Sequence, residues 1–236
     1  MLTQEEREEL LLRREEKERK EIEALLSART EWRRKACFNA FPKLITARIT
    51  QDDNKNPNIT NLVKGYIKAF SEAYKSGYGF TLSSTVGTGK TFAVACIANE
   101  LIDKGYTVYL RTLTDITTEI QRGFNDKDAD STEEVIRKYI EADLLIIDDL
   151  GIQRHTEFAD ETAFQIINQR SLMKKPLLAT TNLTRGQMSA PQELRDKRLF
   201  DRVLEASPII EIQGNSRRTG NSMGAMSFLA GIQKGF

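Results

Sequence analysis

Histidine and cysteine are scarce in this sequence, and long apolar runs are missing. The only histidine is His155, and Cys37 and Cys96 lie far apart without histidine companions, which argues against a zinc site or a disulfide framework. No apolar run approaches the length of a membrane span and the charged N-terminus does not resemble a signal peptide, so we expect a cytoplasmic protein without a membrane partner. The formal net charge is only +1, so any contact with nucleic acid must come from local placement of charge.

A glycine-rich loop lies between a predicted strand and a predicted helix. The apolar run 78–82 predicts the strand, and the stretch 92–101 predicts the helix. The loop residues are Ser84, Thr85, Val86, Gly87, Thr88, Gly89, Lys90 and Thr91. Glycines let backbone N–H groups point at a polyphosphate, and the helix dipole adds to them. Lys90 supplies a cation for the outer phosphates and Thr91 a hydroxyl ligand for magnesium. We therefore predict that these residues and Phe92 bind a nucleoside triphosphate.

Ser84 departs from the common form of this motif, which has glycine at its first position. If that position requires a left-handed backbone, a serine costs about 1 kcal/mol or more there. Under that condition we expect a weaker nucleotide affinity than a glycine would give.

Two acidic residues end the next apolar strand of the chain. The run 144–149 has four apolar residues followed by Asp148 and Asp149, and in a parallel sheet both acids lie at the edge where ligands bind. Asp148 is the predicted partner of the magnesium, together with Thr91, and Asp149 is predicted to orient or deprotonate an attacking water. Asn182, at the end of the apolar run 176–182, is predicted to hold the same water. Together with the glycine loop, these residues predict a nucleoside triphosphatase.

Strands and helices alternate along the middle of the chain. Further strands are predicted at 107–110 and 208–212, and helices at 59–74, 114–124, 132–142 and 192–206. This alternation predicts an α/β fold with a parallel five-stranded sheet flanked by helices. Residues 1–35 are rich in charged residues at helical spacing and predict a helical N-terminal extension, whereas 219–236 have little periodicity and predict a loosely ordered tail.

The order of these motifs resembles that of AAA+ ATPases with a P-loop. More narrowly, it resembles the branch that contains the DnaC-type helicase loaders and the IstB-type transposition ATPases. The resemblance covers roughly residues 58–218. It is carried by the acidic segment 143–151, by 179–182 with its final asparagine, by 198–202 with Arg198 and Arg202, and by 214–218 with Arg217 and Arg218.

The resemblance implies an ATPase that uses ATP and Mg²⁺. The catalytic residues that it implies are Lys90, Asp148, Asp149, Asn182, Arg202 and Arg218. Arg202, supported by Arg198, would reach the nucleotide of a neighbouring subunit, which implies an oligomer when helicase is bound. Arg218, or Arg217 in its place, would touch the phosphate of its own subunit. Asp149 stands where many AAA+ proteins have glutamate, which implies slow turnover, and the short C-terminus leaves room only for a reduced lid.

Loaders of this branch also contact single-stranded DNA through segments after the second strand and after the paired acids. The corresponding residues here are Phe124, Arg122, Arg154, Thr156 and Phe158. An aromatic ring beside a basic side chain suits a stacked base, which is worth about 1 to 3 kcal/mol. The alternative is that Phe124 and Phe158 are ordinary core or helix-end residues.

These inferences divide the chain into three parts. They are a charged helical helicase-docking region with a linker at 1–56, an AAA+ ATPase domain at 57–218, and a flexible tail at 219–236. The resemblance favours a DNA replication protein of a bacterium, prophage or phage that loads a replicative helicase onto single-stranded DNA. Two alternatives stay open: an IstB-like ATPase that assists a DNA transposase, and a module that holds ATP as a switch with almost no hydrolysis.

Overall fold

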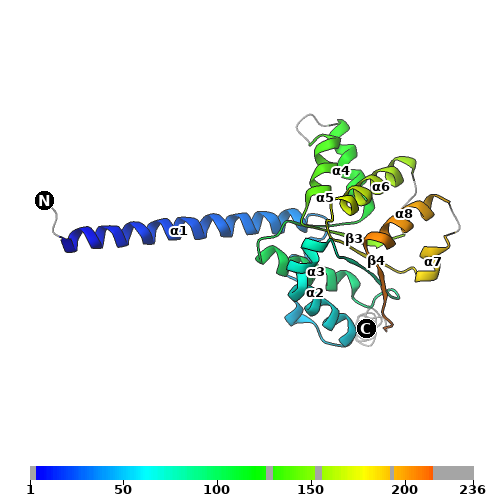
Figure 1. Cartoon of the computed structure of the whole chain (residues 1–236), viewed down its shortest axis with the longest axis horizontal. Coiled ribbons are helices and arrows are strands. Elements are labelled where there is room, and N and C mark those ends of the chain that lie inside the picture. Colours follow the sequence, from blue (N-terminus) through cyan, green and yellow to red (C-terminus); the bar gives the residue numbers. More distant parts are fainter. Residues whose placement is uncertain (1–3, 126–129, 152–155, 192–193, 215–236) are drawn as a thin grey trace, which may run out of the picture.

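A computed structural model describes residues 4–125, 130–151, 156–191 and 194–214, with the backbone alone at 4–11, 124–125 and 194–195 (Figure 1). The helices of this part are α1 (Gln4–Cys37), α2 (Pro57–Ser76), α3 (Lys90–Asp103), α4 (Leu113–Asn125), α5 (Thr132–Glu141), α6 (Glu157–Leu172), α7 (Arg185–Ser189) and α8 (Leu194–Ala206), with 3-10 turns at Pro42–Leu44 and Ile49–Gln51. The strands are β1 (Phe80–Ser83), β2 (Val108–Arg111), β3 (Leu144–Leu150), β4 (Leu177–Thr181) and β5 (Ile209–Glu211).

The five strands form one parallel sheet in the order β2-β3-β4-β1-β5. Because every pair is parallel, the carboxyl ends of all five strands meet at one edge of the sheet. β3 lies in the interior of the sheet, and residues 144–147 are fully buried, which explains its uninterrupted apolar run. The prediction of an α/β fold with a parallel five-stranded sheet is confirmed.

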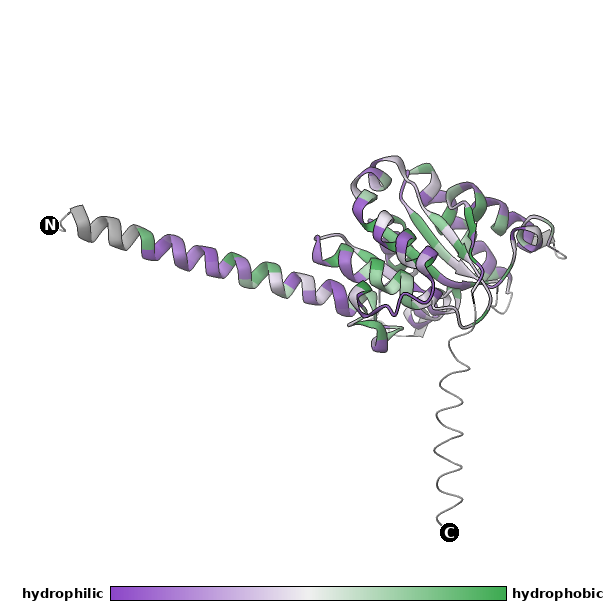
Figure 2. Ribbon diagram, turned by 90° about the horizontal axis from the view of Figure 1, so that it is seen from below, coloured by the Kyte–Doolittle hydropathy of each residue, from purple (hydrophilic) through white to green (hydrophobic). Residues whose placement is uncertain are grey.

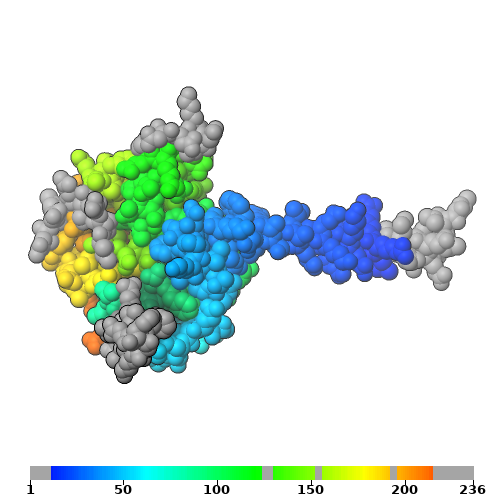
Figure 3. Space-filling model, turned by 180° about the vertical axis from the view of Figure 1, so that it is seen from behind, coloured from blue at the N-terminus to red at the C-terminus, as the bar shows by residue number. Residues whose placement is uncertain are grey.

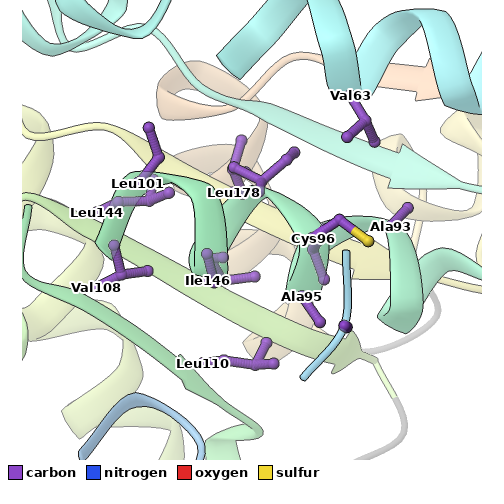
Figure 4. Close-up of a cluster of buried hydrophobic side chains, with 14 of the residues drawn as sticks. Val63, Ala93, Ala95, Cys96, Leu101, Val108, Leu110, Leu144, Ile146 and Leu178 are labelled. Atoms are coloured by element: carbon purple, nitrogen blue, oxygen red, sulfur yellow. The ribbon is translucent and has the colours of Figure 1, made fainter. Parts of the chain in front are cut away.

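Helices cover both faces of this sheet. On one face, α2, α3 and the end of α1 form one core with Leu144 and Ile146. Figure 4 shows α3 beside these two residues. On the other face, α4, α5, α6 and α8 pack against Leu145 and Ile147. Successive side chains of a strand point to opposite faces, so β3 contributes to both cores. The sheet is therefore held rigidly between two layers of helices.

A fully buried arginine, Arg170 of α6, holds the end of α5. Its guanidinium donates hydrogen bonds to the carbonyl oxygens of Tyr139 at 2.7 Å, Ile140 at 3.0 Å, Ala142 at 2.9 Å and Pro176 at 2.5 Å. The last carbonyls of a helix have no partners within the helix, so Arg170 supplies the donors that α5 lacks. Burial lowers the pKa of Arg170 to about 9, so the side chain is still charged at neutral pH.

A second buried arginine, Arg111 at the end of β2, holds the end of α1 in the same way. Its guanidinium donates to the carbonyl oxygens of Ala36 and Cys37 at 2.7 and 2.6 Å. One turn earlier, Arg34 donates to Asn99 and Asp103 of α3. Residues 33–37 at the end of α1, which we call its root, are thus fixed to both the sheet and α3.

Beyond its root, α1 projects from the rest of the molecule as a single helix (Figure 3). Its side chains are exposed from Leu12 to Arg29, with Ile22 at 57%, Leu25 at 70% and Leu26 at 58%. After the root, Phe38 and Ala47 are buried in the core beside α3. The division of the chain near residue 56 stays a prediction, but residues from the root onward pack with the sheet and its helices.

No helix is predicted from the sequence at 157–172, where the structure has α6. The inward side of α6 carries Thr162, Ala163, Ile166, Ile167 and Arg170. A threonine and an arginine at core positions interrupt the apolar periodicity by which a buried helix is normally found.

Within the described residues, no helix is long and apolar enough to cross a membrane.

Candidate nucleotide-binding site

The glycine loop leaves the carboxyl end of β1 and leads directly into α3. Gly87 and Gly89 have φ values of 85° and 97°, a left-handed conformation that costs little without a Cβ atom. Gly89 is the N-cap residue of α3, so the free N–H groups and the positive dipole end of this helix face the loop. The backbone therefore has the form that the motif predicts for a phosphate-binding loop.

Ser84 does not have the left-handed, strained backbone that would weaken the site according to the sequence analysis. Among the described residues other than glycine, only Asn54, Asp149 and Lys174 have a positive φ. Ser84 is instead buried, and its hydroxyl forms a hydrogen bond with the Thr88 hydroxyl across the loop. The condition of a left-handed backbone is therefore not met at Ser84, and strain there gives no reason to expect a weaker site.

Replacing Ser84 with glycine is accordingly expected to bring no gain in nucleotide binding. The change removes the hydroxyl bridge to Thr88 and adds backbone freedom, so the free energy of unfolding should fall by about 0.5 to 1 kcal/mol. ATP affinity by calorimetry and unfolding in urea would measure both effects, with Ser84→Ala as the control that removes only the hydroxyl. A clear rise in ATP affinity for Ser84→Gly would contradict this account.

The Lys90 side chain is buried inside the loop at the first residue of α3. Its ammonium donates to the carbonyl oxygens of Ser84 and Thr85 at 2.8 and 3.1 Å, and to Asn182 Oδ1 at 2.7 Å. Asn182 directly follows β4, which pairs with β1, so two neighbouring strand ends converge on this ammonium. The structure thus brings together Lys90 and Asn182, which the sequence selected separately.

Thr91 and Asp148 also meet at this edge. The Thr91 hydroxyl donates to both carboxylate oxygens of Asp148, at 3.2 and 3.0 Å. Asp148 is buried, and it accepts a further hydrogen bond of 2.6 Å from the Thr180 hydroxyl. Burial is the main cause that raises the pKa of Asp148, with the neighbouring Asp149 carboxylate adding to it, and the two hydroxyl donors act in the opposite direction.

The Asp149 side chain points away from the buried Asp148 side chain because β3 has a bulge at this position. The pairing of β3 with β4 shifts register between Ile147 and Leu150, and Asp149 has a φ of 54°. Its N–H donates to the Thr180 hydroxyl at 3.0 Å, while its side chain is exposed. Bulges of this kind re-aim side chains next to functional sites. Here the bulge separates the two acids into one buried carboxylate beside Thr91 and one that faces solvent.

Thr180 is the functional residue that the sequence reasoning missed. Its hydroxyl donates to Asp148 and accepts from the N–H of Asp149, so it fixes both acids. The sequence feature that could have identified Thr180 is the polar run 180–182 at the end of an otherwise apolar strand.

A second missed contact links the start of α2 to the loop. Asn56, the N-cap of α2, donates to the Gln213 carbonyl at 3.1 Å, and Thr85 donates to the Gly214 carbonyl at 3.0 Å. The chain that follows β5 therefore passes directly beside the glycine loop. Phe92, by contrast, is half-buried in the first turn of α3 and packs on the core.

Arg198 and Arg202 lie on α8 and line a groove of about 830 Å³ between α6 and α8. Arg202 forms an ion pair of 2.6 Å with Glu205 of the same helix. No residue of the glycine loop lines this groove. The two arginines are therefore not assembled with the phosphate loop of their own chain. Arg217 and Arg218 lie outside the described residues.

The predicted DNA-contacting residues are only partly described. Arg122 is exposed near the end of α4, and Phe158 is 38% exposed in the first turn of α6. Thr156 is the N-cap of α6, where its hydroxyl accepts from the N–H of Ala159 at 3.2 Å. The side chain of Phe124 and all of Arg154 lie outside the described residues. A DNA contact by these residues stays a prediction.

The donor groups at the sheet edge fit a magnesium–nucleotide complex. A hydroxyl and a carboxylate are hard oxygen ligands, and Mg²⁺ is usually held by one or two such groups together with substrate phosphates and water. The described residues contain no group of three or more histidine, cysteine or acidic side chains, so they offer no cage that would hold a metal ion without the nucleotide. A glycine loop before α3, a lysine within it, and a strand-end acid beside Thr91 define the P-loop class of nucleotide-binding proteins.

Within that class, residues 76–225 match the model of the family described as IstB-like ATP binding protein. The match covers more than half of the chain, so the chain belongs to this family.

Several named proteins are similar to this chain. The replicative helicase loader DnaC of Escherichia coli is 30% identical over 146 residues, which are 62% of this chain and 57% of that protein. The replicative helicase loader DnaI of Bacillus subtilis is 27% identical over 188 residues, which are 74% of this chain and 59% of that protein. A crystal structure of the DnaC helicase loader matches with a TM-score of 0.60 and 20% identity, over 72% of this chain and 98% of that one. The chain spans less than two thirds of the length of the two relatives.

Proposed function

We propose that this chain is an ATP-dependent loader that places a replicative helicase onto single-stranded DNA. The observation that carries the proposal is the joint similarity to two replicative helicase loaders, DnaC of Escherichia coli and DnaI of Bacillus subtilis. A loader needs a nucleotide site and a separate surface for its helicase. The sheet edge described above suits the first role, and the exposed part of α1 suits the second.

The proposed chemistry is phosphoryl transfer from ATP to water, with magnesium neutralising charge on the phosphates. Lys90 would exchange the Ser84 and Thr85 carbonyls for phosphate oxygens, and Thr91 with Asp148 would hold the metal ion. The exposed Asp149 carboxylate would orient the water, and Asn182 would assist it while it stays within reach of Lys90. Aspartate is one methylene shorter than glutamate, which supports slow turnover.

Completion of the site from a neighbouring subunit is the second part of the proposal. Arg198 and Arg202 line a groove that no loop residue shares, as expected for arginines that act on the nucleotide of another subunit. We therefore propose an oligomer when helicase is bound. Contact with single-stranded DNA through Arg122, Thr156 and Phe158 belongs to the same proposal.

The proposal is tested by loading purified helicase of the host onto single-stranded circles and measuring unwinding. Asp149→Asn should keep ATP binding but lower DNA-stimulated ATP turnover about 100-fold or more, because the general base is lost. Asp130→Asn, which changes an exposed acid away from the loop, is the matched control. Full loading by Asp149→Asn without turnover would instead support a nucleotide switch.

A truncated chain tests the docking surface in the same assay. Deletion of residues 1–28 removes the exposed part of α1 but keeps Arg34, Phe38 and Ala47, which belong to the root and core. This variant should bind ATP normally and fail to bind helicase. Unchanged helicase binding would refute the assignment of α1.

The second candidate function is an ATPase that assists a DNA transposase. The observation that favours it is the family match itself, whose description is IstB-like ATP binding protein. ATP-dependent binding to duplex DNA and stimulation of a transposase, with no effect on helicase loading, would establish it. The roles proposed for Lys90, Thr91 and Asp148 would be unchanged.

A further inference from the structure

A self-complementary stripe runs along α1, from its exposed part to Arg33 at the root, which is only partly exposed. At 100° per residue, Glu15, Glu18, Ile22, Leu26, Arg29 and Arg33 all point within about 40° of one direction. Two acids lie in the N-terminal half of this stripe, two arginines lie in the C-terminal half, and two apolar residues lie at its centre. Figure 2 shows the corresponding alternation of hydrophilic and hydrophobic turns along the helix.

The apolar centre of the stripe is not covered by the chain itself. Ile22 is 57% exposed and Leu26 is 58% exposed, and Leu25 beside them is 70% exposed. These residues lie where α1 has already left the root, so they do not contact the helices that cover the sheet (Figure 1). A cluster of exposed aliphatic side chains on one helix face is typical of a surface that packs against a partner.

From this pattern we propose that α1 pairs in antiparallel orientation with α1 of a second copy of the chain. A half-turn about an axis that crosses the stripe at the height of Ala24 along the helix places Glu15 opposite Arg33 and Glu18 opposite Arg29. The same rotation places Ile22 opposite Leu26, so the apolar centres cover each other. Each pairing occurs twice, because the interface is the same surface on both copies.

The order of the charges selects this arrangement over others. A parallel pair would place acids against acids and arginines against arginines, which opposes association. A membrane-surface helix has a broad apolar face, whereas α1 carries charged residues around its whole circumference, with Glu16, Glu21 and Glu23 among them. Glu18 is bonded to Arg14 of its own helix at 3.1 Å, but both side chains are well exposed, so this ion pair is weak and Glu18 is able to change partners.

The expected dimer is weak and sensitive to salt. Only a few aliphatic side chains per helix are covered, and association has a substantial entropic cost, so we expect a dissociation constant in the micromolar range. The ion pairs remain near solvent, so added salt should weaken the dimer. Because the stripe includes the surface that the proposed function assigns to helicase, helicase should compete with self-association.

Sedimentation equilibrium of the full chain, without nucleotide or helicase, tests the proposal. The variants Glu15→Arg/Glu18→Arg and Arg29→Glu/Arg33→Glu should each dimerise at least about tenfold more weakly, because like charges then face each other. An equimolar mixture of the two should regain the dimer mass. Glu16→Arg/Glu23→Arg changes the charge equally at positions outside the stripe, about 100° to 120° from its centre, and this control should behave like the unaltered chain.

Cross-linking tests the orientation, and it does not depend on Arg33, which lies at the root. A mixture of Ile22→Cys and Leu26→Cys chains should form mixed disulfides in preference to disulfides between identical chains. The native Cys37 and Cys96 do not interfere because both are fully buried. An unaltered chain that stays monomeric at all concentrations, charge variants that dimerise normally, or a preference for disulfides between identical chains would each overturn the proposal.

Discussion

Replacing Arg170 with methionine is expected to lower the free energy of unfolding by about 3 to 5 kcal/mol, because one buried guanidinium serves several buried carbonyls. Without it, the Tyr139, Ile140 and Ala142 carbonyls lose the donor that Arg170 supplies. The Pro176 carbonyl keeps only the longer hydrogen bond of 3.5 Å from the Leu145 N–H. Each unsatisfied buried group costs about 1 to 3 kcal/mol. The substitution also removes the free-energy cost of burying a charged group, which is the cost that lowers the pKa of Arg170. This gain offsets only part of the loss, since four acceptors are affected.

Urea unfolding followed by circular dichroism measures this effect. Arg137→Met is the matched control, because Arg137 lies on α5 but is exposed, and its change should stay within about 0.5 kcal/mol. Arg170→Lys should recover little, because an ammonium group cannot reach the same set of carbonyls with the geometry of a guanidinium fork. Equal stabilities of Arg170→Met and the control would contradict the role of Arg170 in holding α5.

Replacing Lys90 with alanine is expected to weaken ATP binding and abolish measurable turnover, with a loss of about 100-fold or more in the rate of hydrolysis. The ammonium is the only charged group in the described part of the loop, and it lies among the Ser84 and Thr85 carbonyls. Its removal leaves these carbonyls facing the triphosphate without an intervening positive charge. Lys90→Arg should not restore activity, because the wider guanidinium does not fit the space that Lys90 fills at 5% exposure.

Calorimetric titration with ATP and magnesium separates binding from turnover in this experiment. Lys104→Ala is the matched control, because Lys104 caps the other end of α3 and its ammonium donates to the Ile67 carbonyl, away from the loop. That variant should bind and hydrolyse ATP normally. Normal ATP affinity in Lys90→Ala would show that the nucleotide binds elsewhere.

The sequence predicted the sheet and most of the nucleotide-binding loop because both are encoded locally. Buried strands read as short apolar runs, and the loop is a fixed spacing of glycine, lysine and threonine. The contact of Asn182 with Lys90 was not predicted as such, but it agrees with a general property of parallel sheets, whose strand ends share one edge.

Other features depend on tertiary contacts and were not predictable from local patterns. α6 was missed because Arg170, a core residue of that helix, looks like a surface residue in the sequence. The bulge that separates Asp148 from Asp149 depends on how β3 pairs with β4, and its consequence, the role of Thr180, was missed with it. The condition raised for Ser84 was not met, and this was not predictable because a motif does not specify the φ value at each of its positions.

The way α1 is fixed makes it a mechanical lever. From its root to its free end the helix is about 45 Å long, so a rotation of about 10° at the root would displace the free end by about 8 Å. The root is bonded to α3 through Arg34, and α3 begins at the residue that contacts the phosphates in the proposed mechanism. A rearrangement too small to disturb the core could therefore be amplified at the far end of the arm. Whatever is attached there would report the nucleotide state over a distance greater than the width of the sheet.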